Sequence, residues 1–465
     1  MIQTIRKAWG IPELRKKIVF TLLILLIFRV GNAIPTPYIN TELLGAYIDS
    51  TGGSLLSLYN VMSGGAFAQA TVFALGVQPY INSSIIIQLL TIAIPALERL
   101  ARDGGEAGKK KIASITRYAT VAIALLQAFG YYMICKNYGI LEQSGIWPAL
   151  VIIVTLVAGS SFVMWLGEQV NEFGIGNGIS MILFANIVAS FPNTLVRIFK
   201  LIFNTNKNLP DLVNSGYTVT HPNLWWIGTI IGVLGLVMCV ALIAFMVFMT
   251  NSERRLPVQY AKRVVGRKMY GGQNTTLPLK LNMTGVMPII FASSIVSIPA
   301  TISMFTGHQN ATSGFWGWSN GFNQFNWLYI LVFGLLLVAF AYFYVAISFN
   351  PVEVANNLKK NGGSIPGIRS GKPTSDYISR VLSRVTFIGA ICLLIIACLP
   401  MILGCIGNAA GTGVSGSTTT YNWSYALTYF SFSGNSLLIV VGVVLETVRA
   451  IEAQMTMRNF KGFLE

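Results

Sequence analysis

Residues 326–349, NWLYILVFGLLLVAFAYFYVAISF, carry no charged side chain and favour a helix that crosses a lipid bilayer. A helix rises about 1.5 Å per residue, so about 20 apolar residues cross the roughly 30 Å of hydrocarbon. Similar runs recur along the 465-residue chain, which is 54% hydrophobic and 10% charged. Soluble domains are about one quarter charged, and membrane β-barrels show short alternating segments instead of continuous runs. The sequence therefore predicts an all-α integral membrane protein.

Hydropathy along the whole chain predicts ten transmembrane helices. The first follows a basic tail and shows no cleavage pattern after it, so we expect it to remain as a helix. The fifth is interrupted by Pro192. The predicted spans are 18–34, 70–95, 113–134, 148–167, 178–203, 225–250, 284–305, 326–349, 382–404 and 433–450.

The basic residues predict the sidedness of these spans. The chain has 32 Lys and Arg against 16 Asp and Glu, a net charge of +16. If the spans alternate, 27 of the 32 fall on one side, in the two tails and three connecting loops. The other side holds only Lys136, Arg197, Lys200 and Lys207, and Arg29 lies inside the first span. Because basic residues collect in cytoplasmic loops, both termini are expected to be cytoplasmic.

The ten spans divide into two sets of five, which fits the inverted-repeat plan of many transporters. We expect an N-terminal half over 1–205, a C-terminal half over 206–450 and a cytoplasmic tail over 451–465. Two cytoplasmic loops, about 251–283 and 350–381, are far longer than a turn between helices needs. They form either a solvated basic surface near anionic lipids or a docking site for a cytosolic partner, acidic or rich in RNA phosphate.

The stretch between the first two spans contains a short apolar segment, SLLSLYNVMSGGAF at 54–67. It is too short to cross a bilayer. It therefore lies at the membrane interface or enters the bundle as a re-entrant half-helix, and we favour the second. Gly64 and Gly65 at its end predict a flexible joint.

The sequence carries no catalytic motif. It has no complete P-loop or HExxH motif, and GIGNGIS at 174–180 lacks the GxGxxG spacing. Both histidines fall in predicted outer loops, and the five cysteines form no CxxC pair. We therefore expect no enzyme activity, no metal and no cofactor. A secondary transporter for a small solute is the main alternative, but the spans hold few ionisable residues, mainly Arg29 and Glu446. A purely structural scaffold would not explain the short apolar segment.

Small polar residues gather in two of the spans. They are Asn82, Ser83, Ser84 and Gln88 in the second span, and Ser293, Ser294 and Ser297 in the seventh. Such residues commonly join neighbouring helices. The alternative is a seam between helices that can open.

Several longer stretches, in order from the first span to the tenth, resemble the bacterial SecY family, which forms the pore of the Sec protein translocation channel. They are FRVGNAIPTPYI (28–39), FALGVQPYINSSIIIQLL (73–90), GEQVNEFGIGNGIS (167–180), LPLKLNMTGVMPIIFASSI (277–295), NPVEVANNLKKNGG (350–363) with PGIR (366–369), and GNSLLIVVGVVLETV (434–448). The resemblance covers nearly the whole chain. It implies two five-helix halves that close around a central hourglass pore.

The same resemblance implies roles for individual residues. A ring of aliphatic side chains would form the constriction, at Val77, Ile81, Ile179, Leu183, Ile290 and Ile439. The short apolar segment would be a plug, with Leu56, Leu58, Tyr59, Val61 and Met62 below the ring and Gly64 and Gly65 as its joint. The second and seventh spans would form a lateral gate, with Asn82, Gln88, Ser294 and Ile298 facing the seam. Cytosolic partners would dock on Arg255, Arg263, Arg267, Lys268 and Arg369.

The implied partners are SecE-like and SecG-like small membrane subunits, the SecA ATPase, the ribosome, translocating polypeptides and anionic lipids. The implied location is the bacterial inner membrane. Two features depart from the family pattern. Pro257 stands where family members have an aliphatic residue, and the outer loop at 404–433 is long and rich in Gly, Ser and Thr.

Overall fold

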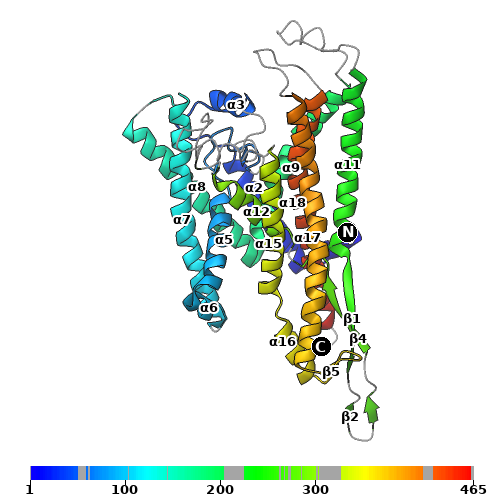
Figure 1. The fold of residues 1–465 in the computed structure, drawn as a ribbon. Coiled ribbons are helices and arrows are strands. Elements are labelled where there is room, and N and C mark those ends of the chain that lie inside the picture. Colours follow the sequence, from blue (N-terminus) through cyan, green and yellow to red (C-terminus); the bar gives the residue numbers. More distant parts are fainter. Residues whose placement is uncertain are drawn as a thin grey trace.

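The computed structural model is a bundle of long helices that run side by side, with a small group of strands at one end (Figure 1). The structure describes residues 2–50, 59–60, 63–102, 104–143, 145–203, 225–260, 263–265, 268–270, 274–283, 285–299, 302, 326–411 and 423–461. The C-terminus lies at the same end as the strands, and α3 lies at the opposite end (Figure 1). The end that carries the strands is called the basic end below.

The helices follow the predicted spans closely. Those of the N-terminal half are α1 (Ile2–Trp9), α2 (Pro12–Gly31), α3 (Thr41–Ser50), α5 (Gln78–Ala93), α6 (Pro95–Arg102), α7 (Gly105–Asn137), α8 (Ile146–Phe173) and α9 (Gly178–Phe203). Those of the C-terminal half are α11 (Trp225–Asn251), α12 (Met287–Val296), α15 (Trp327–Ser348), α16 (Pro351–Lys360), α17 (Lys372–Gly411) and α18 (Trp423–Lys461). Each predicted span overlaps one of these helices.

Five helices in the described part of the chain are long and apolar enough, each by itself, to cross a membrane, and a sixth span forms if the bent pair α5 and α6 counts as one. Helix α2 carries several charges in its first turns, and α12 is short. The prediction of a helical membrane protein is confirmed, while the count of ten spans stays a prediction.

The second span differs from the prediction at both ends. Its helix α5 begins at Gln78, not at residue 70, because Gly76 adopts a left-handed φ of +54° and Pro79 stands in the first turn. It ends before Ile94, whose extended backbone precedes Pro95. Helix α6 then continues at 105° to α5.

The last two helices are longer than predicted. Helix α17 begins at Lys372, inside the expected loop 350–381, and runs to Gly411, while α18 begins at Trp423 and continues to Lys461. The described parts of the expected outer loop 404–433 are thus helical. The expected boundary at 450 is not a break in the chain's backbone structure, because α18 runs through it. Apolar content alone set the predicted limits, whereas backbone hydrogen bonds carry a helix on through polar residues.

The basic end also contains strands, which an all-helical prediction did not include. They are β1 (Glu253–Tyr260), β2 (Arg263–Val265), β3 (Lys268–Tyr270), β4 (Asn274–Lys280) and β5 (Gly363–Ser364). The order β4-β1-β5 forms one antiparallel sheet, and β2 and β3 form a separate hairpin. Pro257 of β1 pairs with Thr276 of β4. On the other edge of β1, β5 pairs only with Gln259 and Tyr260, so Pro257 has no strand partner on that edge among the described residues. A proline, which has no N–H, is tolerated at such an edge.

The two halves pack by neighbouring helices. In the first half α5 packs on α7, α7 on α8, and α8 on both α2 and α9. In the second half α12 packs on α15, α15 on α17, and α17 on α18, which also contacts α11. Helix α9 joins the halves through contacts with α11 and α18. The largest hydrophobic cluster draws side chains from both halves.

Candidate functional site

The six aliphatic residues predicted for the constriction lie in one hydrophobic cluster within the bundle. Val77, Ile81, Leu183, Ile290 and Ile439 are buried members of this cluster, and Ile179 is partly buried and packs against it. They come from α5 and its N-cap, α9, α12 and α18, so both halves contribute. The tertiary structure thus brings together residues that are far apart in sequence. Their role as a pore constriction stays a prediction.

Two of these helices begin in the same way. In GVQP (76–79) and GVMP (285–288) the glycine adopts a left-handed φ, +54° and +64°, and the valine is the N-cap of the helix. The proline then occupies the first turn, where its missing N–H has no cost. The two motifs stand at the start of the helices of the second and seventh predicted spans, α5 and α12.

This repeat identifies Val286 as the counterpart of Val77, which reasoning from the sequence missed. Val286 is buried in the same cluster as the predicted ring residues. It packs so closely on α18 that a Cβ at Gly442 would overlap its side chain. The signal in the sequence is the repeated GVxP pattern, whose valine stands four residues before Ile81 in one case and four before Ile290 in the other.

The start of α9 is fixed by asparagine side chains. Asn171 Oδ1 accepts a hydrogen bond from the Gly178 N–H at 2.7 Å, and Asn177 Oδ1 accepts one from the Ile179 N–H at 3.1 Å. These bonds satisfy donors that the first turn of a helix leaves free. They fix the backbone that carries the predicted ring residues Ile179 and Leu183.

The polar residues of α5 divide between two faces. Ser83 is fully buried and donates to the Thr116 carbonyl of α7 at 2.8 Å, so it joins two helices of the same half. Asn82 Oδ1 is buried and has no hydrogen-bond partner within the described part of the chain. Gln88 is half-buried and interacts with the Tyr344 hydroxyl of α15, in the other half. The role of Asn82 and Gln88 in a gate stays a prediction.

The seventh span shows a comparable pattern around Ser294. The hydroxyls of Ser293 and Ser297 donate to carbonyls of their own helix, those of Ile290 and Ser294, at 2.9 and 2.8 Å. Ser294 is half-buried, and Ile298, just past the end of α12, is 50% exposed. These two hydroxyls therefore bond to carbonyls within their own helix.

The predicted plug is described only in part. Leu56, Leu58, Val61 and Met62 lie outside the described residues. Tyr59 packs on a second hydrophobic cluster, with its ring centroid 6.1 Å from that of Phe67. Gly64 and Gly65 both adopt left-handed φ values, +69° and +90°. The predicted joint therefore uses backbone conformations that favour glycine.

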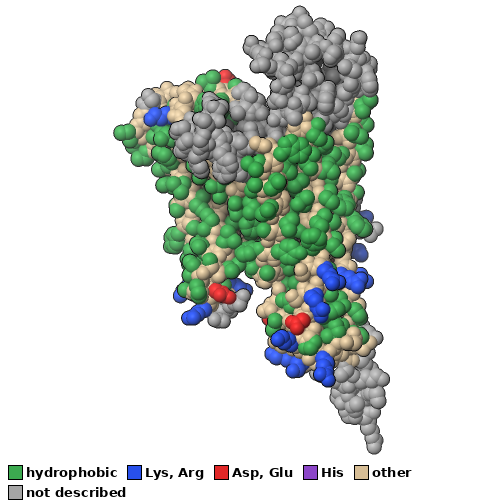
Figure 2. All heavy atoms as spheres, in the orientation of Figure 1, with side chains coloured by type: hydrophobic (Ala, Val, Ile, Leu, Met, Phe, Trp, Pro, Cys, Tyr) green, Lys and Arg blue, Asp and Glu red, His purple; other side chains and the backbone are tan. Residues whose placement is uncertain are grey.

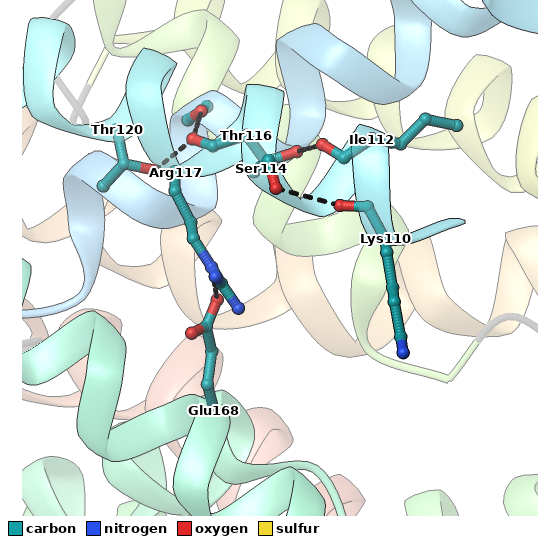
Figure 3. A network of polar contacts seen from close by, with 8 residues as sticks. Lys110, Ile112, Ser114, Thr116, Arg117, Thr120 and Glu168 are labelled. Carbon is teal, nitrogen blue, oxygen red and sulfur yellow. Dashed lines mark hydrogen bonds and ion pairs between the residues drawn. The ribbon is translucent and has the colours of Figure 1, made fainter. Parts of the chain in front are cut away.

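An ion pair joins two neighbouring helices of the N-terminal half. Arg117 Nε of α7 lies 2.8 Å from Glu168 Oε1 of α8, and Figure 3 shows the two side chains pointing toward each other. Above and below it, the hydroxyls of Ser114, Thr116 and Thr120 donate to carbonyls one turn earlier in α7. The ion pair and the Ser83 bond link α5, α7 and α8 to one another.

The two long basic loops form one folded unit at the basic end. A separate hydrophobic cluster buries side chains from both loops: Leu256 and Val258 of β1, Leu279 of β4, Leu358 of α16, Ile365 directly after β5, and Ile378 of α17. Along β1 the buried Leu256 and Val258 alternate with exposed neighbours, as expected for a strand with one face on a core. The described parts of the two loops therefore share one hydrophobic core.

Four of the five predicted docking residues lie in described parts of the two basic loops. Arg255 is exposed on β1 and pairs with Glu253 at 2.6 Å, and Arg369 is exposed in the turn before α17, its carbonyl accepting from Thr374 Oγ1. Arg263 and Lys268 lie in β2 and β3, while Arg267 lies outside the described residues. In the face that Figure 2 shows, Lys and Arg gather at the basic end and the middle of the bundle is almost wholly hydrophobic.

Comparisons with known proteins point to one family. Residues 71–448 match the SecY family model. The chain is 42% identical to the protein translocase subunit SecY of Streptomyces scabiei over the full length of both chains, and 39% identical to that of Mycobacterium tuberculosis over 97% of both. Two solved structures described as a protein-conducting channel and as a SecY plug-domain study share its fold, each at TM-score 0.59 and 15% identity over 97% of both chains. This chain therefore belongs to the SecY family.

Proposed function

We propose that this chain is the central subunit of a Sec-type protein-conducting channel, a passive gated pore for unfolded secretory polypeptides. The observation that carries the proposal is the single buried cluster formed by Val77, Ile81, Leu183, Ile290 and Ile439, with Ile179 packed against it. Aliphatic side chains from both halves meet there, so separating the halves would open a path between them. The family consists of channel subunits and not of enzymes.

The physical problem is to move a polar backbone across hydrocarbon. Each unpaired backbone group costs several kcal/mol in an apolar medium. Water-filled funnels on both sides of a narrow ring would shorten the apolar distance to the ring itself. Aliphatic side chains suit such a ring because they bind no peptide group and exclude ions by dewetting when closed.

A hydrophobic segment would leave sideways into the lipid. Leu-like residues favour the bilayer by about 0.3–0.6 kcal/mol each. The exit requires the seam between α5 and α12 to open. We propose that Asn82 faces this seam. Its Oδ1 is buried with no hydrogen-bond partner among the described residues, and such an atom would destabilise the closed seam.

The driving force would come from partners, SecA or the ribosome, on the folded unit at the basic end. This end of the structure carries the exposed side chains of Arg255 and Arg369 and the backbone of Arg263 and Lys268. A structure titled "Sec61 in the Canine ribosome-channel complex" has a similar fold, at TM-score 0.55. We further propose SecE-like and SecG-like subunits, contacts with anionic lipids, and a bacterial inner-membrane location with both termini cytoplasmic.

The ring is tested by replacing Ile81, Ile179 and Ile439 with Gly in the reconstituted chain. The variant should conduct ions across planar bilayers because the apolar seal is lost. A matched control replaces Ile48, Ile134 and Ile152, which are buried in the second hydrophobic cluster, with Gly. Conductance of the ring variant no higher than that of this control would show that the ring is not the seal.

A further inference from the structure

Two buried asparagines form a polar contact between the first and fifth predicted spans. Asn32 is the C-cap of α2, and its Nδ2 donates to Asn186 Oδ1 of α9 at 3.3 Å. Asn32 is 7% exposed and Asn186 only 1%. Asn186 stands between Leu183 and Ile187, which are both in the largest hydrophobic cluster. An amide pair in such apolar surroundings costs free energy, so its position needs a reason.

The segment predicted to form the plug closely approaches one member of this pair, Asn186, through Gly64. A Cβ built on Gly64 would lie 3.0 Å from the Cα, the carbonyl oxygen and the Oδ1 of Asn186. Only a residue without a side chain fits this approach without a shift of the neighbouring backbone. Gly65 has a similar left-handed backbone, but nothing among the described residues lies within 4 Å of a Cβ built there.

The segment around Gly64 is held in shape by its own polar contacts. Asn60 Oδ1 accepts from the Ala68 N–H, and Ser63 Oγ accepts from the Phe67 N–H, both at 3.0 Å. The Tyr131 hydroxyl of α7 donates to the Phe67 carbonyl, also at 3.0 Å. Gly64 is therefore presented to α9 by a defined loop.

The same segment is tied at its far end to the chain that follows Asn32. The Thr36 N–H donates to the Ala70 carbonyl at 2.7 Å, and the Val72 N–H donates to the Ile34 carbonyl at 3.0 Å. Residues 63–72 thus contact α7, α9 and the end of α2 together. A change in the distance between α2 and α9 would therefore change the contacts of Gly64.

We propose that Asn32 and Asn186 form a polar seat that positions the Gly64 loop and holds the channel closed. This inference rests on the proposed function as a gated pore. The seat also allows the Gly64 loop to leave, because Asn32 Oδ1 is buried without a hydrogen-bond partner in the described part of the chain. When the loop leaves, water from the outer funnel can reach that oxygen and offsets part of the lost contact.

The test compares Gly64→Ala with Gly65→Ala in the full-length chain reconstituted with its membrane subunits. Both substitutions place a Cβ on a left-handed backbone, but only the first meets Asn186. We measure ion leak in planar bilayers and the labelling rate of an Ala66→Cys thiol by a membrane-impermeant reagent, in a background without native cysteines. Ala66 is buried and has no polar side chain to lose, so its label reports departure of the loop.

G64A should raise both leak and labelling severalfold to about tenfold over G65A, the change expected when one buried contact is lost. Asn32→Ala and Asn186→Ala should each do the same, and the double variant should do no more than either, since both remove one bond. Equal behaviour of G64A and G65A, or wild-type readouts in both asparagine variants, would overturn the seat. If the ring variant conducts ions while G64A does not, the proposed seat is wrong and the proposed pore is retained. If neither variant conducts ions, the proposed pore is wrong as well.

Discussion

Replacing Asn82 with Leu should hold the seam between α5 and α12 closed. Asn82 Oδ1 is buried with no hydrogen-bond partner among the described residues. A buried acceptor in this state costs about 1–3 kcal/mol, and the cost disappears when an open seam lets water in. Leu has a similar size and no polar atom, so the closed state gains about this free energy relative to the open one.

The magnitude sets the size of the expected effect. About 1.4 kcal/mol is a factor of ten in an equilibrium constant, so the fraction of channels with an open seam should fall by about one to two orders of magnitude. The assay is the rate at which the reconstituted N82L channel releases a hydrophobic segment into lipid, compared with the wild-type chain.

Ser83→Ala is the matched control. Ser83 is the next residue of α5, but its hydroxyl bonds to Thr116 inside the same half. Its loss should lower the temperature of thermal unfolding and leave the release rate unchanged. Release by N82L at the wild-type rate would refute the reasoning, because the unpartnered oxygen would then have no bearing on the seam.

Three further outcomes are expected. Cysteines at positions 82 and 298 should cross-link α5 to the end of α12 and block export. Arg369→Glu should impair motor-driven secretion, because the exposed guanidinium on the basic end is replaced by an opposite charge, while membrane insertion of the channel itself stays normal. Gly363→Val should weaken the β1–β5 pairing, because even a Cβ there lies 3.0 Å from Tyr260 Cε1. The expected destabilisation is roughly 1–3 kcal/mol, and it should make proteolysis of the two loops faster.

Each of these has a result that counts against it. Export that continues with the cross-link formed would exclude the seam from the path. Full secretion by Arg369→Glu would remove that residue from the docking surface, with Arg380→Glu on the same unit as the charge-matched control. Unchanged proteolysis in Gly363→Val would show that β5 does not hold the two loops together.

Apolar runs and basic loops predicted the parts of the structure that depend on local composition. The run at 326–349 became α15, and the Lys and Arg predicted for one side gather at one end of the bundle (Figure 2). Partition of a side chain between lipid and water is a property of that residue and its near neighbours, so it can be summed along a sequence. The start of α5 at Gln78 could also have been predicted from the sequence, because Gly76 and Pro79 mark it.

The contacts between distant segments were decided only by the tertiary structure. Nothing near Asn32 in the sequence indicates Asn186, and β1 pairs with Gly363 and Ser364, which follow α12, α15 and α16 in the sequence. The alternation of Leu256 and Val258 could have suggested a strand, but not its partners. Ser83 is paired, whereas Asn82 Oδ1 has no partner among the described residues. The difference depends on which atoms the folded chain places within about 3.5 Å, and composition does not determine that distance.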